Sequence, residues 1–145
     1  MASFKQSAAR LIAVLLAGAA LCACGQHDRL DADTLAREVR SLASLSAEAA
    51  LLIDELRAGH LEPTFVAAHL RDLRDDATMA QHEIAKPAPT GIQQRQAAAQ
   101  ALATDLTQAL RDIAITQDGP AARLERDRQR VVQLKRTFDA LGQSR

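Results

Sequence analysis

One set of polar side chains has a spacing that could hold a metal ion. His69, Asp72 and Asp76 are three and then four residues apart, so on a helix they share one face. An imidazole nitrogen and two carboxylates can bind a divalent metal ion, and Met79 adds a thioether on the same face for a softer one. The alternative is a stripe exposed to water and paired with neighbouring arginines. The residues at this spacing are Phe65, His69, Asp72, Asp76, Met79 and Glu83.

Other residues capable of catalysis do not form a known catalytic motif. The six glycines are scattered singly, so no phosphate-binding loop is predicted, and no Gly-x-Ser-x-Gly elbow occurs. Neither Glu-x-x-His pairs for di-iron nor a Cys-x-x-Cys-His motif for haem is present. His27 and His60 are interpreted as surface residues, and His82 as a favourable charge near a helix C-terminus. We therefore expect neither an enzyme nor a bound cofactor.

The first residues have the layout of an export signal. Lys5 and Arg10 are the only charged residues within 1–23, and an apolar run follows them at 11–20. A positive start, a short apolar middle and a small-residue exit are typical of a secretory signal peptide. A membrane-spanning helix needs about 20 apolar residues, and this run is shorter.

The end of this segment, Leu21-Cys22-Ala23-Cys24, resembles the lipobox of bacterial lipoproteins, in which a small residue precedes the modified cysteine. Cys24 fits that position better than Cys22, which follows the bulky Leu21. The resemblance covers residues 1–24. It implies that Cys24 becomes the mature N-terminus and carries a diacylglyceryl thioether and usually an N-acyl chain such as palmitate. Several acyl chains anchor a protein stably, because each buried methylene contributes about 0.8 kcal/mol.

The residue after Cys24 implies a location. In lipoproteins of Gram-negative bacteria, an Asp at this position tends to retain the protein at the inner membrane, and this chain has Gly25. The resemblance therefore implies a lipid-anchored protein of the cell envelope, at the outer membrane and facing the periplasm. Its expected partners are the membrane, through the anchor, and another envelope protein.

Composition after removal of residues 1–23 argues against several kinds of partner. Basic residues fall from 18 to 16 against 18 acidic ones, so the net charge of −2 is too balanced for a nucleic-acid-binding domain. Phe65 and Phe138 are the only aromatic residues left, which disfavours sites that stack sugars or single-stranded nucleic acid. With Cys22 removed and Cys24 acylated, no thiol remains for a disulfide. Stability must then come from apolar burial.

The remaining chain has helix-end signals and a helical period. Gly59 is the residue type expected just past a helix end, and Pro63 suits a first helical turn. Thr90 and Gln93 predict a capping box. Apolar residues recur at alternating steps of three and four, which indicates helices rather than strands. The predicted helices span about 34–58, 63–86, 91–115 and 120–141, after a tether at 24–33 and before a tail at 143–145.

These segments predict an all-α protein, an up-down-up-down antiparallel four-helix bundle over residues 34–142. Short connections force neighbouring helices to run in opposite directions, and alanines on the apolar stripes allow close approach. Ser46 and Asp127 fall on these stripes, where polar residues often set register. For Asp127 two environments are open: burial beside an arginine of another helix, or a hydrated end of the bundle.

The last predicted helix is basic, with a net charge of +3 over residues 120–141. It ends near the anchored start of the first helix, so Lys135, Arg136 and Arg145 could contact a partner or anionic headgroups, at roughly 1 kcal/mol per cation. The alternative is a solvated face paired with the acidic first and second helices.

Two functions are consistent with these patterns. One is a lipid-anchored protein-interaction, adaptor or accessory module of the cell envelope. The other is a periplasmic helical bundle that binds a metal or small ligand through His69, Asp72 and Asp76.

Overall fold

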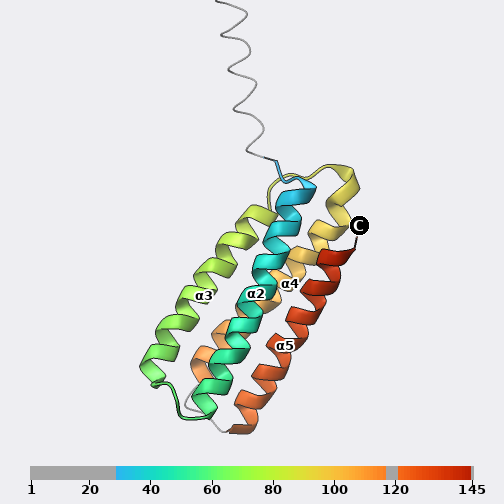
Figure 1. Ribbon diagram of the computed structural model, residues 1–145. Helices are drawn as coiled ribbons and strands as arrows, with labels where there is room; N and C mark the ends of the chain where they lie inside the picture. The colour runs from blue at the N-terminus through green and yellow to red at the C-terminus, as the bar shows by residue number, and fades with distance from the viewer. Residues whose placement is uncertain (1–28, 117–120, 145) are drawn as a thin grey trace, which may run out of the picture.

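The computed structural model describes residues 29–116 and 121–144 (Figure 1). Within these ranges the regular structure is helical, and none of the described helices is long and apolar enough to cross a bilayer. Predictions that concern Cys22, Cys24, His27, Arg145 and the Gly119-Pro120 break lie outside the described residues. The helices are α2 (Ala32–Arg57), α3 (Pro63–Ile84), α4 (Gln93–Thr116) and α5 (Ala121–Gln143), with a short 3-10 turn η1 (Thr90–Ile92) before α4.

The four helices lie side by side, each antiparallel to the next in the chain (Figure 1). α2 packs most extensively against α5, and α3 against α4, while the contact between α2 and α3 is the least extensive of the neighbouring pairs. The prediction of an all-α four-helix bundle is confirmed. The start of α2, the connection from α3 to α4 and the end of α5 lie at one end, here called the N-terminal end of the bundle.

One apolar core runs the length of the bundle, along the stripes predicted from the sequence. On α2 the buried stripe includes Leu35, Leu42, Ala49 and Ile53, none more than 1% exposed. Phe138 of α5 is the largest fully buried side chain. Small residues occur on the buried stripes of α2, α3 and α4, which lets these helices approach their neighbours closely. The buried alanines with no more than 1% exposure are Ala49, Ala77, Ala99, Ala103 and Ala109.

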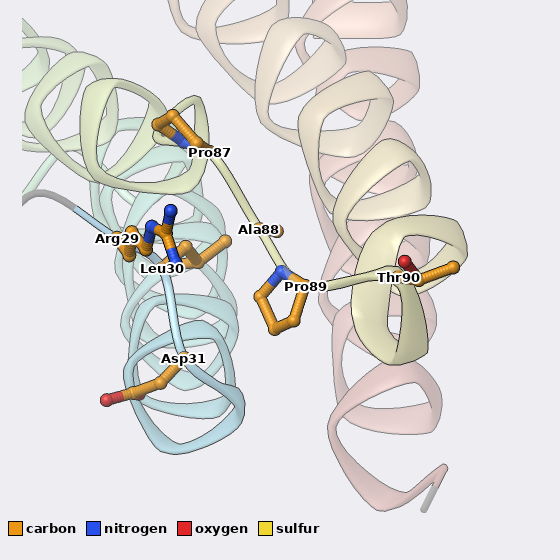
Figure 2. Close-up of a pocket in the computed structure, with 7 residues that line it drawn as sticks. All are labelled: Arg29, Leu30, Asp31, Pro87, Ala88, Pro89 and Thr90. Atoms are coloured by element: carbon orange, nitrogen blue, oxygen red, sulfur yellow. The ribbon is translucent and has the colours of Figure 1, made fainter.

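The chain joins this core before the first helix begins. Leu30 is 1% exposed, and its backbone N–H donates to the carbonyl of Pro87 at 3.0 Å, in the connection from α3 to α4. Figure 2 shows Arg29, Leu30 and Asp31 beside this connection. The sequence placed Leu30 within the polar tether. It is instead part of the bundle, because its apolar side chain is buried and its backbone is hydrogen-bonded.

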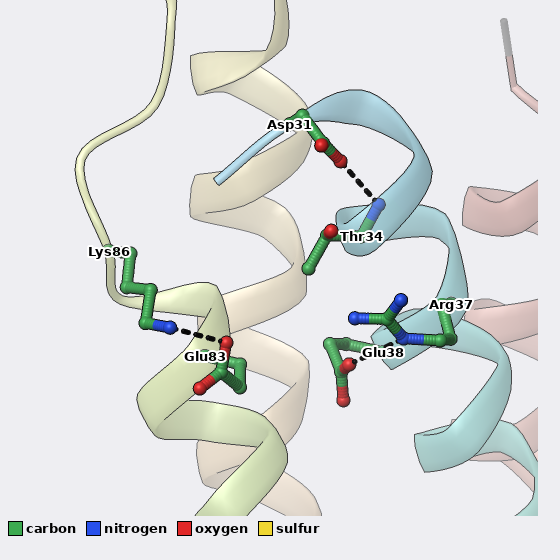
Figure 3. Close-up of polar contacts among 6 residues, drawn as sticks. All are labelled: Asp31, Thr34, Arg37, Glu38, Glu83 and Lys86. Atoms are coloured by element: carbon green, nitrogen blue, oxygen red, sulfur yellow. Dashed lines mark hydrogen bonds and ion pairs between the residues drawn. The ribbon is translucent and has the colours of Figure 1, made fainter. Parts of the chain in front are cut away.

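α2 begins at Ala32, two residues before the expected start, because Asp31 caps it. The Asp31 carboxylate accepts a hydrogen bond from the backbone N–H of Thr34 at 2.7 Å (Figure 3). This bond satisfies one of the free donors in the first turn and lowers the pKa of Asp31 below its ordinary value.

Gly59 ends α2 as predicted, in a left-handed conformation with φ of +74°. Its N–H donates to Leu56 O at 3.1 Å, and the N–H of His60 donates to Glu55 O at 3.0 Å. These two bonds form a Schellman motif, which satisfies carbonyls that the helix itself leaves free. His60 also contacts the carboxylate of Glu55, with 2.9 Å between Nδ1 and Oε2.

The end of α3 is capped by side chains from α4. The side-chain amide of Gln96 donates to Ile84 O at 2.6 Å and to Lys86 O at 2.8 Å, and Gln100 donates to Ile84 O at 3.3 Å. The capping box predicted from Thr90 and Gln93 is wrong. Thr90 instead opens η1, whose start has no side-chain cap, and the Gln93 amide donates to Ala88 O at 3.2 Å.

α5 extends past its expected end at Leu141 to Gln143. Gly142 therefore lies inside the helix, and a Cβ there would lie 3.7 Å from Cγ1 of Val39, an ordinary contact. Near this end the guanidinium of Arg95 donates to Leu141 O at 3.4 Å, a weak bond to a carbonyl of the last turn.

Candidate functional site

The polar stripe predicted on α3 lies on the side of that helix that faces α2. The imidazole of His69 reaches the carboxylate of Glu48 on α2, with 2.6 Å between Nε2 and Oε1. Further along α3, Asp76, Met79 and Glu83 line a groove together with residues of α2. The sequence therefore placed these side chains correctly on one face.

The predicted metal ligands are not brought together. His69 is occupied by Glu48 and stacks on the ring of Phe65, with 5.8 Å between ring centroids and 13° between the planes. Asp72 and Asp76 are exposed. Among the described residues no three His, Cys, Asp or Glu side chains are placed to hold one metal ion. The pairing with Glu48 comes from another helix, so spacing along α3 could not predict it.

The groove between α2 and α3 has a volume of about 470 Å³. Leu45 and Ala80 are buried at its floor. Charged side chains stand at its rim: Glu38 from α2 and Glu83 from α3 (Figure 3). The residues that line it are Glu38, Ser41 and Leu45 on α2 and Asp76, Met79, Ala80, His82 and Glu83 on α3.

Neither ion pair at the rim crosses the groove. Glu83 pairs with Lys86, just beyond the end of its own helix, at 2.7 Å between Nζ and Oε2. Glu38 pairs with Arg37, its neighbour in sequence, at 3.2 Å between Nε and Oε1. Figure 3 shows both pairs on their own sides of the groove. The groove thus stays open between the two helices.

Large apolar side chains are exposed on the same two helices. Within the described ranges these are Leu51 on α2, and Phe65 and Met79 on α3, with 58%, 53% and 61% exposure. Met79 lines the groove, and Phe65 lies fourteen positions before it on the same stripe. Single exposed apolar residues are normal on a protein surface, and Met79 is the one of these three that lines the groove.

The other neighbouring helix pairs are bridged by more polar contacts than α2 and α3. Between α2 and α3 the bridge in the described residues is the single contact of His69 with Glu48. Side-chain bridges between the other pairs include Arg57–Glu125 and Arg128–Asp54 (α2 to α5), Gln81–Thr104, Gln96–Ile84 and Gln100–Ile84 (α3 to α4), and Arg130–Asp112 and Arg95–Leu141 (α4 to α5).

Several cations of α5 are paired with neighbouring helices. Arg128 reaches Asp54 of α2 at 2.6 Å, which raises the pKa of the guanidinium, and Arg130 reaches Asp112 of α4 at 2.7 Å. Lys135 pairs within α5, with Asp139 at 2.6 Å. Arg136 is exposed. Of the cations predicted to contact a membrane or partner, Lys135 is thus half-buried in an ion pair and Arg136 faces solvent, while Arg145 lies outside the described residues.

A second pocket, of about 790 Å³, lies at the N-terminal end of the bundle (Figure 2). It is lined by residues of the segment 29–31 and of the connection 87–90, among them Arg29, Asp31, Pro87 and Pro89. Its two charged residues do not form a catalytic or metal-binding group. The pocket reflects how the first described residues pack against the connection.

The α2 half of the groove was not predicted from the sequence. Leu45 and Glu48 flank the core stripe of α2, but their spacing does not distinguish a groove from ordinary surface. The sequence signal for the groove lies on α3 instead. Its polar stripe contains no arginine, because Arg71 and Arg74 both fall outside the stripe.

Fold and site together define a class: an all-α four-helix bundle with an open, acidic groove between its first two described helices. Comparison with protein-family models, with curated proteins and with solved structures found no match to this chain.

Proposed function

We propose that this protein is a lipid-anchored, periplasm-facing lipoprotein that acts as a protein-interaction, adaptor or accessory module of the cell envelope. The anchor rests on the lipobox-like Leu21-Cys22-Ala23-Cys24. The interaction role rests on one observation, the exposure of Phe65 and Met79 on the stripe of α3 beside the groove.

The anchor is tested by intact-mass spectrometry of the protein from membranes of its native host. We expect a chain that begins at Cys24 with the added mass of a diacylglyceryl group, and a Cys24→Ser variant that leaves the membrane fraction. Recovery of a chain that begins at Met1, or that has a free Cys24 thiol, would contradict the anchor.

The interaction role is tested by photo-crosslinking in living cells of the native host. A photoreactive amino acid replaces Phe65, Met79 or, as control, the exposed Gln133 on α5. We expect discrete crosslinked products from positions 65 and 79 and none of the same size from position 133. The same products from all three positions, or none from 65 and 79, would exclude this surface as an interaction site.

A further inference from the structure

We propose that the groove between α2 and α3 binds a cationic amphipathic helix of another envelope protein. This inference rests on the proposed function, because it names the partner class for that interaction. The groove offers an apolar floor at Leu45 and Ala80, an exposed thioether at Met79, and carboxylates at both rims. A helix with apolar side chains on one face and Lys or Arg beside them matches this arrangement.

The shape of the surface fits a helix better than an extended peptide. Two antiparallel helices leave a groove between them into which a third helix packs, as helices do within bundles. The stripe from Phe65 to Glu83 spans eighteen residue steps, about 27 Å along α3, which is about five helical turns. Phe65 and Met79 would contact apolar side chains of the partner near the two ends of this length.

The charges along the surface select a cationic partner. No Lys or Arg occurs on the α3 stripe, and Arg71 and Arg74 lie off it. Asp76 makes no ion pair or hydrogen bond with any residue in the described part of the chain. Five acidic residues lie on this surface. Glu38, Glu48 and Glu83 contact Arg37, His69 and Lys86, so the carboxylates of this surface that are unpaired among the described residues are Asp72 and Asp76.

A second copy of this chain fits less well. The outer face of α5 is its most cationic surface, with Arg123, Arg126 and Arg136 exposed, but the other exposed residues of α5 are alanines and glutamines. It therefore offers no large apolar side chain for the groove. Anionic surfaces, including acidic headgroups, are repelled by the carboxylates. These comparisons favour a helix from a different protein.

The experiment measures binding of designed helical peptides to the mature chain, residues 24–145, with Cys24→Ser. This chain keeps the four described helices and the whole core. The peptide has 18 residues, with Leu at helical i, i+3, i+4, i+7 spacing and Lys at the flanking positions. One control peptide replaces Lys by Glu, and another replaces Leu by Gln. Fluorescence anisotropy gives the affinities, and 13C-methyl NMR of Met79, the only internal methionine after residue 23, reports the site.

We expect saturable binding of the Lys/Leu peptide, a shift of the Met79 methyl signal, and weaker binding as salt rises from about 50 to 500 mM. Both control peptides should bind at least about tenfold more weakly. Asp76→Lys should weaken binding of the Lys/Leu peptide at least about tenfold. Asp75→Lys makes the same charge change one residue away, off the stripe, and should change the affinity less than about threefold.

Three results would overturn the proposal: no saturable binding of the Lys/Leu peptide, equal binding of the Glu peptide, or equal losses from Asp75→Lys and Asp76→Lys. A concentration-dependent dimer that Asp76→Lys dissociates would identify a second copy as the occupant and overturn it too. If crosslinks form at positions 65 and 79 but the Lys/Leu peptide does not bind, the proposed interaction role is supported and only the cationic helix is excluded as the partner. Absence of those crosslinks would remove the module itself.

Discussion

Buried polar side chains in this bundle bond to main-chain carbonyls rather than to polar side chains of other helices. The hydroxyl of Ser46, fully buried, donates to Leu42 O at 2.8 Å, and that of Thr107 donates to Ala103 O at 2.9 Å. Both bonds stay within one helix and therefore cannot fix one helix against another. Ser46 was predicted to set the register between helices. That register must come instead from the shapes of the apolar side chains around it.

Asp31 gives the stability of the protein a defined pH dependence. Its pKa in the folded chain lies below its ordinary value of 3.8, chiefly because the backbone N–H of Thr34 bonds to the charged form. The stabilisation is therefore complete above about pH 5 and is lost as pH falls through the lowered pKa. We expect Asp31→Ala to lower the urea midpoint at pH 7, and its deficit against wild type to shrink as pH falls from about 4 to 2.

Asp31→Asn is the matched control for this prediction. Its amide oxygen can accept the bond from Thr34 but carries no titrating proton. It should retain most of the wild-type stability at pH 7, and its stability advantage over Asp31→Ala should not fade below pH 4. A deficit of Asp31→Ala that is the same at pH 2 and pH 7 would show that the charge at this cap has no stabilising role.

Single residues of the site were predictable where they depend on their own helix. The face shared by Phe65, His69 and Met79 follows from helical spacing alone. The partner of His69 could not be predicted from helical spacing, because Glu48 is 21 positions away and reaches His69 only through the packing of α2 on α3. A metal site needs ligands fixed relative to one another in three dimensions, and spacing on one helix does not supply that.

Helix ends, like the site residues, were predictable where they depend on the local sequence and not where they depend on another helix. Gly59 and Pro63 marked their helix ends correctly because their effects on the backbone are local. The end of α3 is different, since its carbonyls bond to Gln96 and Gln100 of α4. The helix ends at Gly59 and Pro63 and the apolar stripes were therefore predictable, whereas the start of α2, the end of α5 and the caps made between helices were not.

The left-handed turn at Gly59 is required by the connection between α2 and α3. Its φ of +74° costs a residue with a Cβ about 1–2 kcal/mol. Gly59→Ala should lower the free energy of unfolding by about this amount in urea titrations. Gly91→Ala is the control, because φ there is not positive and a Cβ would meet no atom within 4 Å. Equal effects of the two substitutions would show that the backbone conformation at Gly59 is not what matters.

Charge is unevenly distributed over the whole molecule. Acidic residues exceed basic ones on α2 and α3, and basic residues predominate on α5. The pairs Arg57–Glu125 and Arg128–Asp54 join α5 to α2, as the solvated-face alternative for the basic helix predicted. Partly exposed pairs of this kind contribute little to stability, typically below about 1 kcal/mol. Their main effect is on which charges remain available at the surface.

Leu30 links the first described segment to the stability of the entire bundle. Its side chain is 1% exposed among the residues of the N-terminal end. Leu30→Ala should lower the free energy of unfolding by about 2–3 kcal/mol, within the range for removing a buried leucine. Leu51→Ala, the same substitution at a side chain that is 58% exposed, should change it by less than about 0.5 kcal/mol. Similar losses from both variants would mean that Leu30 is not anchored in the core.

The fixed position of Leu30 also limits how far the bundle can lie from a lipid anchor on Cys24. Six residue steps separate Leu30 from Cys24, which is at most about 22 Å of fully extended chain. With an acyl group on Cys24, as proposed above, the domain would operate in a shallow layer next to the lipid and could not search the full width of the compartment. Any helix it captures would have to come within that layer, so a target near the same leaflet would meet it far more often than one free in the surrounding space.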